Sequence, residues 1–348
     1  MSEYNELFGK YYQEAEKYLQ NMNLEERIGQ MFFIKYTENA SQEISKKKFG
    51  GFVLYANFFN REDNLIQNNM KNIQNLSRKA VNLPLGLAVD EEGGFVNRVS
   101  LYKREEGIFP SSKDIYKSSG IEGVLIIEEE KRNLLRKYRL NINLAPFADI
   151  SYNPKDFIYK RTFGKTANET SEYIAKTVEG YVNNNFTCCV KHFPGYGNNL
   201  DTHGEISNDK RNYETFLNED LKPFKAAIGN KVPMILFSHN IVKCRDNKYP
   251  ASISKIWHDI LRNELKYSGL ILTDDLSMGA IKKYIIDESE SVLAVKAGND
   301  IMITGDYDKH LNEVIKAVQS GEIEENLIYK ACRRIIAWKL KYLLLKTF

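Results

Sequence analysis

Eight short apolar runs, separated by longer polar stretches, most constrain the fold of this 348-residue chain. The runs lie at 30–34, 51–55, 85–89, 142–144, 187–190, 234–237, 270–273 and 301–304. Between most of them, apolar residues recur at helical spacing, over 61–80, 122–138, 169–184, 213–228, 254–265 and 288–297. Strands that alternate with helices make right-handed crossovers and so form a parallel sheet. Eight such units predict an α/β fold, a closed (β/α)8 barrel of the TIM type.

Two further helices are expected outside these units. An amphipathic helix over 3–20 lies in an N-terminal extension, 1–22, and a final helix runs from after Gly321 to about Leu345. The chain contains no linker rich in Pro, Gly or Ser, no low-complexity tract and no internal repeat. Because barrels of this size form one domain, we expect a single domain over 1–348.

Composition excludes several classes of partner. Lysine and arginine number 49 against 46 acidic residues, and they are spread along the chain, whereas a nucleic-acid binder concentrates them on one face. No apolar run approaches the length that spans a membrane. The N-terminus is acidic and lacks the pattern of a signal peptide, and the four cysteines form no CxxC pair. We therefore expect a cytoplasmic protein with reduced thiols and without nucleic-acid or membrane partners.

Reactive side chains follow the last six of the apolar runs, as they do at the top face of a barrel. The most informative stretch is 191–203, where Lys191 and His192 precede a glycine-rich loop that carries Asp201 and His203. Asp201 and His203 are two positions apart, so in an extended segment their side chains point to the same side. A carboxylate beside an imidazole fixes its tautomer and tunes its pKa, as a general acid/base requires.

Residues 191–203 also carry a family resemblance. Lys-His-Phe-Pro-Gly followed by Asp-Thr-His resembles the signature of glycoside hydrolase family 3, in its single-domain bacterial β-N-acetylhexosaminidase branch. Tyr196 stands where that branch usually has a second histidine, and the segment before Asp201 is one residue shorter than usual. Both departures lie in the loop and bear on fine substrate preference.

Two more segments resemble motifs of this family and imply residues that bind sugar. Residues 90–98 resemble Asp-x-Glu-Gly-Gly-x-Val-x-Arg, which implies that Asp90 accepts hydrogen bonds from sugar hydroxyls and that Arg98 donates them. Residues 161–164 resemble Arg-Ser-Phe-Gly, which implies that Arg161 reaches the sugar subsite. Glu92 is interpreted as a buried partner rather than a catalyst.

Lys191 and His192 are expected to contact the ligand. They follow an apolar run, so their side chains are partly buried, and a buried lysine without an acceptor is costly. Asp149 either binds substrate or orients a neighbour, and a structural role is equally compatible with its position. For His239, a satisfied core histidine is the favoured interpretation.

Residues 273–278 resemble the family segment that carries the catalytic nucleophile, which implies that Asp274 attacks the anomeric carbon. That role requires an ionised carboxylate on a rigid strand end, within reach of the sugar. Two aspartates after a strand are, taken alone, more often a helix cap or a metal ligand. Asp275 is expected to cap while Asp274 faces the site.

The resemblance predicts a retaining exo-glycosidase that releases terminal β-linked N-acetylglucosamine from an oligosaccharide or muropeptide, as in peptidoglycan recycling. Asp274 forms the glycosyl-enzyme, and His203, held by Asp201, serves as acid and then base. No cofactor or metal is expected. A family 3 β-N-acetylglucosaminide phosphorylase and a β-glucosidase are the alternatives, although family β-glucosidases take a catalytic Glu from a second domain.

Two other classes stay open. His192, Asp201, His203, His239 and Asp274 could assemble the metal site of a barrel amidohydrolase, but this chain lacks the early His-x-His of such sites. A catalytically silent sugar-binding protein is the third class, and it is disfavoured because every expected reactive position is filled.

Overall fold

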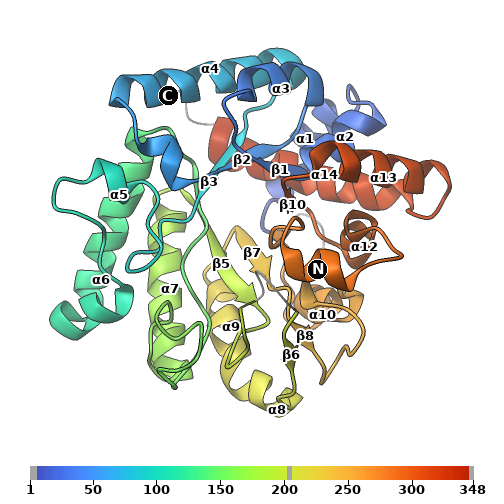
Figure 1. Ribbon diagram of the computed structural model, residues 1–348. Helices are drawn as coiled ribbons and strands as arrows, with labels where there is room; N and C mark the ends of the chain where they lie inside the picture. The colour runs from blue at the N-terminus through green and yellow to red at the C-terminus, as the bar shows by residue number, and fades with distance from the viewer. Residues whose placement is uncertain (1–5, 202–205, 345–348) are drawn as a thin grey trace.

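The computed structural model describes residues 6–201 and 206–344, and its centre is an eight-stranded parallel sheet (Figure 1). The strands are β1 (Phe32–Lys35), β2 (Gly51–Leu54), β3 (Gly86–Val89), β4 (Ile142–Asn143), β5 (Thr187–Phe193), β7 (Met234–Phe237), β9 (Leu270–Thr273) and β10 (Met302–Thr304). Their order is β10-β1-β2-β3-β4-β5-β7-β9, and a parallel bridge between Leu272 and Ile301 joins the two ends. The predicted barrel is confirmed.

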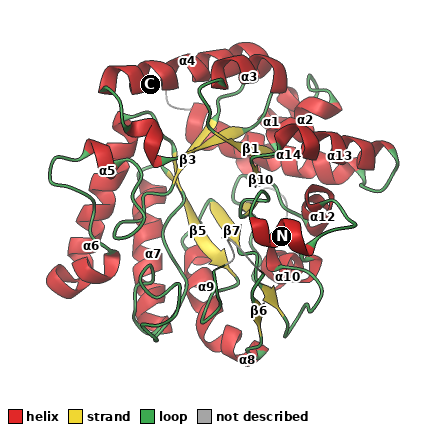
Figure 2. Cartoon of the chain, in the orientation of Figure 1, coloured by secondary structure: helices red, strands yellow, loops and turns green. Residues whose placement is uncertain are grey.

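Helices surround the sheet, as Figure 2 shows. The longer ones are α1 (Tyr12–Leu19), α2 (Leu24–Gln30), α3 (Ala40–Lys47), α4 (Asp63–Val81), α6 (Ser112–Lys137), α7 (Ala167–Asn183), α9 (Leu221–Gly229), α12 (Glu290–Ala297), α13 (Tyr307–Gln319) and α14 (Glu325–Lys339). Shorter ones are α5 (Ser100–Lys103), α8 (Tyr213–Thr215), α10 (Lys255–Asp259) and α11 (Gly279–Tyr284). Across residues 6–201 and 206–344, no helix combines the length and apolar character needed to cross a bilayer.

Several expected boundaries differ from the observed ones. Gln30 is the last residue of α2 rather than part of a strand, because Asn23 and Glu26 form a capping box that starts the helix. The strand expected at 187–190 continues to Phe193, because Lys191 and Phe193 still pair with β7. The helix expected over 213–228 is interrupted by a π-helical turn at Phe216–Asp220.

Most of the core is a continuous apolar cluster that extends from Phe8 to Leu343, and a small separate cluster consists of Phe147, Ile158 and Tyr196. Both flanking helices contribute to the larger cluster, since α1 packs its buried face against α14. The N-terminal helix is shorter than predicted and begins at Tyr12, after a 3-10 turn at Gly9–Tyr11. The C-terminal helix ends in a π-helical turn, Leu340–Leu344.

Lys339 is a fully buried cation at the end of the barrel where β1 and β2 begin. Its Nζ donates to Gln30 Oε1 at 2.7 Å and to the Gly50 carbonyl at 3.0 Å, and no carboxylate pairs with it in the part of the chain described. Burial lowers the pKa of Lys339 from 10.5 to about 7. Between these two values the unfolded chain binds more protons than the folded one, so this group makes stability rise with pH.

Replacing Lys339 with methionine should therefore remove a pH-dependent contribution to stability. Relative to Lys339→Met, the wild type should gain up to about 1.4 kcal/mol of unfolding free energy per pH unit above about pH 7. Urea unfolding of both proteins at about pH 7 and about pH 9.5 measures this difference. Lys79→Met, at an exposed position, is the control. Over this pH range the wild type should gain more unfolding free energy relative to Lys339→Met than relative to Lys79→Met. An equal or smaller gain would contradict the prediction.

Candidate active site

A cavity of about 510 Å³ opens at the carboxyl ends of the strands. Six side chains predicted from the sequence line it: Asp90, Arg98, Arg161, Lys191, His192 and Asp274. The cavity is also lined by Lys35, Tyr55 and Asp275, which follow or end their own strands. The barrel thus gathers residues that are far apart in sequence around one polar space of the size that holds a small ligand.

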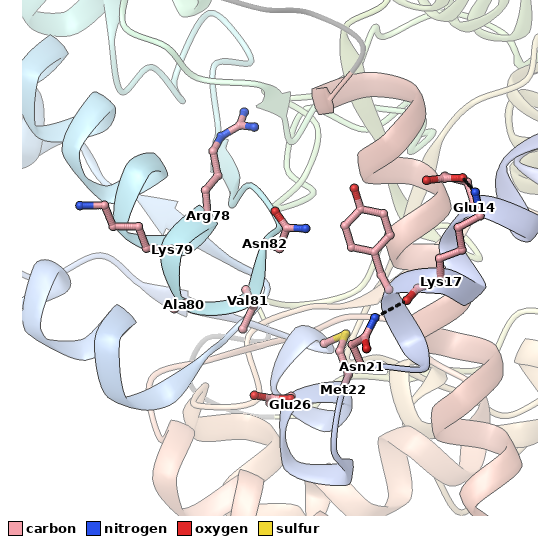
Figure 3. Close-up of a pocket in the computed structure, with 11 residues that line it drawn as sticks. Glu14, Lys17, Asn21, Met22, Glu26, Arg78, Lys79, Ala80, Val81 and Asn82 are labelled. Atoms are coloured by element: carbon pink, nitrogen blue, oxygen red, sulfur yellow. Dashed lines mark hydrogen bonds and ion pairs between the residues drawn. The ribbon is translucent and has the colours of Figure 1, made fainter.

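A second cavity, of about 470 Å³, lies between α1, α2 and the end of α4 and lacks converging reactive groups (Figure 3). Lys17 is paired with Glu14 at 2.6 Å, and the Asn21 amide donates to the Lys17 carbonyl at 2.9 Å. Lys79 extends away from the Glu14–Lys17 pair in Figure 3. In this second cavity Glu14 and Lys17 pair with each other, and Glu26 pairs with Lys48. The cavity at the strand ends is therefore the candidate active site.

One wall of the candidate site is a buried network of two cations and two carboxylates. Lys191 Nζ lies 2.6 Å from Asp90 Oδ1 and 2.7 Å from Glu92 Oε1. The Arg161 guanidinium donates to both Glu92 oxygens, at 3.0 and 2.7 Å, and lies over the Phe147 ring. Lys191 therefore has two acceptors, which offset the cost of burying its charge.

The network fixes the charge of its members. Burial alone would raise the pKa of Glu92, but Arg161 and Lys191 outweigh it and hold the pKa well below its usual range. Burial would likewise lower the pKa of Lys191, yet Asp90 and Glu92 raise it. Glu92 is thus an ionised carboxylate that is occupied by two cations, which makes it a support for the binding residues rather than a proton donor.

Removing the Glu92 charge should strongly destabilise the fold. Glu92→Gln leaves Lys191 and Arg161 short of a counter-charge in a buried site, and breaking such a pair costs about 3–5 kcal/mol. Urea unfolding measures the loss. Glu106→Gln is the control, because that exposed carboxylate lies 3.6 Å from Arg104 and should contribute at most about 1 kcal/mol. Equal losses in the two variants would contradict the assignment.

Asp149 orients His192, which lines the cavity. Its Oδ2 lies 2.8 Å from His192 Nδ1 and accepts the His192 backbone N–H at 3.1 Å. Its Oδ1 accepts the Tyr196 backbone N–H at 2.7 Å. With Nδ1 held by Asp149 and Phe147 packed edge-on against the ring, the Nε2 side of His192 remains for a ligand. Of the alternatives open for Asp149, the geometry supports orientation of a neighbour.

Asp274 stands at the wall of the cavity, directly after β9. Its backbone N–H donates to the Phe237 carbonyl at 3.1 Å, and its Oδ1 accepts the Asp275 N–H at 2.8 Å. Burial would raise the pKa of Asp274, but His239, His192, the Asp275 amide and Lys191 together lower it. The structure thus supplies an ionised carboxylate with one oxygen held by the backbone, at the end of a rigid strand.

The neighbours of Asp274 have structural contacts. Asp275 Oδ1 accepts the Ser277 N–H at 2.8 Å, which is the expected capping of the following turn, and its Oδ2 pairs with Lys35 at 2.9 Å. His239 is buried, with Nδ1 at 2.7 Å from the Ser252 hydroxyl and Nε2 at 3.1 Å from the Asp275 carbonyl. Both of its ring nitrogens are engaged, as in a satisfied core histidine.

Arg98 lines the cavity, and a neighbouring carboxylate fixes its backbone. The Arg98 Nε is buried and has no hydrogen-bond partner among residues 6–201 and 206–344. Glu91 holds the backbone beside it, since Glu91 Oε2 accepts the N–H groups of Arg98 and Val99 at 2.9 and 2.7 Å.

Of the acid/base pair expected from the sequence, the structure describes Asp201 alone. Asp201 is exposed and is not among the residues that line the cavity, and His203 lies outside the described residues. Their acid/base role therefore stays a prediction. Lys35 and Tyr55 line the cavity but were not proposed from the sequence, although each lies where a strand ends. That position is the signal that would have found them.

Two of the histidines considered for a metal-dependent amidohydrolase already have protein partners. His239 uses both ring nitrogens, and His192 uses Nδ1 toward Asp149. Within the described part of the chain, the group of side chains close enough to share an ion is Glu290, His310 and Glu313, on α12 and α13. In this group Lys309 Nζ lies 3.1 Å from Glu290 Oε1, so this carboxylate already has a cationic partner from the protein.

A barrel with an ionised carboxylate, cationic donors and a polar cavity at its strand ends has the architecture of a barrel hydrolase. The family model for the glycosyl hydrolase family 3 N terminal domain matches residues 23–338. The chain therefore belongs to glycoside hydrolase family 3, and it is a glycoside hydrolase enzyme whose substrate is a carbohydrate.

Individual relatives agree with this assignment. A β-hexosaminidase of Idiomarina loihiensis is 33% identical over 236 residues, which cover 65% of this chain and 69% of that protein. An uncharacterized secreted glycosyl hydrolase of Arthroderma benhamiae is 28% identical and covers 84% and 85%. The structure of a family 3 β-N-acetylglucosaminidase from a Paenibacillus species superposes with a TM-score of 0.87 at 26% identity, over 94% of this chain. This chain spans 64% of the length of that neighbour.

Proposed function

We propose that this protein is a retaining exo-β-N-acetylglucosaminidase that works through a covalent glycosyl-enzyme. The observation that carries the proposal is Asp274, an ionised carboxylate whose Oδ1 is held by a backbone amide while the cavity lies beside it. The names of the Idiomarina loihiensis relative and of the Paenibacillus neighbour support a 2-acetamido sugar as the substrate.

The reaction proceeds in two displacements. Asp274 Oδ2 attacks the anomeric carbon, the glycosidic C–O bond breaks, and His203 donates its proton to the departing oxygen. His203 then removes a proton from water, which attacks the same carbon and releases Asp274. Asp201 orients the imidazole through both steps. This scheme uses an imidazole where glycosidases commonly use a second carboxylate.

Binding follows from the network at the opposite wall. Asp90 Oδ1 accepts a hydrogen bond from Lys191 Nζ, and its second oxygen accepts hydrogen bonds from sugar hydroxyls. The Arg98 guanidinium and the Nε2 side of His192 supply further polar contacts. Glu92 holds Lys191 and Arg161 in place before the sugar binds. This lowers the entropic cost of ordering these two side chains on binding.

We further propose that the enzyme is a single-domain cytoplasmic protein that acts on muropeptide fragments in peptidoglycan recycling. The free cysteines support this location. The Arthroderma benhamiae relative is named as secreted, so cell fractionation discriminates. Activity in the soluble cytoplasmic fraction is expected, and activity in the culture medium would contradict the proposal.

A panel of chromogenic glycosides tests the substrate and the acceptor. Nitrophenyl N-acetylglucosaminide should react much faster than nitrophenyl glucoside, and added phosphate should leave the product as free sugar. Comparable rates on the two glycosides would favour a β-glucosidase, and a glycosyl phosphate product would favour a phosphorylase. Dialysis against a chelator should not change the rate, whereas a loss restored by a divalent ion would revive the amidohydrolase alternative.

A further inference from the structure

A third cavity, of about 540 Å³, lies at the end of the barrel opposite to the candidate active site. Its lining residues include Val232 and Gly269, which come just before β7 and β9, so this cavity faces the amino ends of the strands. The 3-10 turn before α1 and the π-helical turn after α14 complete its wall. None of the described residues that line it lines the candidate active site, and its volume is that of a small-molecule site.

The charge of this cavity is strongly positive, because four lysine side chains line it: Lys10, Lys231, Lys266 and Lys341. Across residues 6–201 and 206–344, none of these four ammonium groups has a carboxylate oxygen within 4.0 Å. Glu6 also lines the cavity, and it accepts a hydrogen bond from the Tyr12 hydroxyl at 2.5 Å. The described part of the protein therefore leaves most of the positive charge of this lysine cavity unbalanced.

Three of the ammonium groups act on one another. Lys341 is half-buried, with its Nζ 5.1 Å from the centre of the Tyr342 ring and 5.9 Å from that of Phe8. Burial lowers the pKa of Lys341, and the positive charges of Lys231 and Lys10 lower it further. Like charges held in one cavity destabilise the folded protein, and an anion bound between them relieves this repulsion.

Lys231 and Lys266 stand at turns between a helix and the following strand. Lys231 follows α9 and precedes β7, and Lys266 follows the π-helical turn Ile260–Glu264 and precedes β9. Both have positive φ, 62° and 57°, a conformation that glycine and asparagine adopt most readily. The turns therefore do not require lysine at either position, and asparagine can remove each charge while it keeps the backbone conformation.

The donors of the lysine cavity indicate which anion fits. An ammonium is a compact charge with three N–H donors, and lysine commonly binds phosphate, whereas arginine is favoured where both oxygens of a carboxylate are bound. No arginine is among the described residues that line this cavity. One phosphoryl group carries about 1.5 to 2 negative charges at pH 7, so four lysines are balanced by more than one such group.

From the four lysines that share this cavity without a described counter-charge, we propose that the lysine cavity binds a small soluble anion with two or more phosphoryl groups. The ammonium groups donate hydrogen bonds to the phosphoryl oxygens, and the bound charge removes the repulsion around Lys341. This site lies at the other end of the barrel from Asp274, so the inference goes beyond the proposed function and does not rest on it.

Isothermal titration calorimetry with tripolyphosphate, at constant ionic strength, tests the proposal. The variants are Lys231→Asn and Lys266→Asn, and the matched control is Arg139→Asn. Arg139 also has positive φ, 60°, and also joins a helix to a strand at this end of the barrel, between α6 and β4. It does not line the lysine cavity, so its substitution removes one positive charge at the same kind of turn elsewhere.

The wild type and Arg139→Asn should bind tripolyphosphate with equal affinity. Each lysine variant should bind about fivefold more weakly, the loss expected for one charge-assisted contact at a partly exposed site. Tripolyphosphate should also raise the urea midpoint of the wild type more than that of either lysine variant, because the anion binds the folded protein. Should either variant fail to fold, Lys10→Gln, at an exposed position of the 3-10 turn, provides the same comparison.

Three results would each overturn the inference. The first is no saturable binding to the wild type at millimolar tripolyphosphate. The second is lysine variants that bind no more weakly than Arg139→Asn, because the four lysines would then form no site. The third is citrate, which carries three carboxylates, binding as tightly as tripolyphosphate, because the cavity would then not select phosphoryl groups.

Vesicles distinguish the source of the phosphoryl groups. After centrifugation with vesicles of phosphatidylglycerol and phosphatidylcholine, the protein should stay in the supernatant, because the lysines line a concave cavity that admits a small anion. Pelleting of the wild type that is lost in Lys231→Asn and Lys266→Asn, without binding of tripolyphosphate, would assign the lysines to a lipid surface and contradict the proposed soluble ligand.

Discussion

Asp274→Ala should reduce kcat by about 10⁴-fold or more on every glycoside, the largest loss expected of any single substitution in this protein. The carboxylate forms the covalent bond in the first step, so the rate should fall for substrates with good and with poor leaving groups. Its ionised state is maintained by His192, His239, Lys191 and the Asp275 amide, and a neutral side chain at this position has no comparable nucleophile. Steady-state kinetics with a good and a poor leaving group measure the loss.

Small external anions provide a second readout for the same variant. Azide can enter the space that Asp274→Ala opens and attack the anomeric carbon, which should restore activity and give a glycosyl azide of inverted configuration. Asp275→Asn is the control, because Asp275 lines the same cavity but caps a turn and pairs with Lys35. A loss in Asp275→Asn that exceeds the loss in Asp274→Ala would exchange the two roles.

His203→Ala should have the second largest effect, and its size should depend on the leaving group. A general acid contributes roughly 10²–10⁴ in rate, mainly where the departing oxygen needs its proton. Nitrophenolate leaves without help, so glycosylation by that substrate should slow modestly, while a natural disaccharide should suffer most of the loss. Water attack also needs the base, so the variant should show a burst with the nitrophenyl substrate.

Asp201→Asn should give a milder form of the same behaviour, because the imidazole remains but loses the carboxylate that orients it. Rapid mixing resolves the burst, and steady-state rates on both substrates give the selectivity. Equal losses on the two substrates without a burst would mean that His203 binds or orients the sugar.

Much of the barrel could be predicted because each strand is a short apolar run that ends in a polar residue. Asp90, Lys191, His192 and Asp274 share one cavity because the carboxyl ends of all the strands face the same way. The predicted ends of helices and strands were less accurate where a single side chain, rather than the apolar pattern of the sequence, sets the end. Gln30 belongs to α2 because of a cap seven residues earlier, at Asn23.

The contacts between these residues could not be predicted. Nothing in the spacing of Glu92, Arg161 and Lys191 indicates that one carboxylate is shared by two cations, since the three are separated by many residues and meet only through the barrel. The same holds for Asp149 and His192, which pair between neighbouring strand ends.

The most direct test of the mechanism is to trap the glycosyl-enzyme and map the residue that carries it. A slow 5-fluoro N-acetylglucosamine donor keeps the 2-acetamido group, allows the first displacement and delays the second, so the intermediate accumulates. Proteolysis and mass spectrometry should find one sugar attached to Asp274, in the peptide that follows β9. Label on any other residue, or complete inactivation without a covalent adduct, would contradict the covalent role of Asp274.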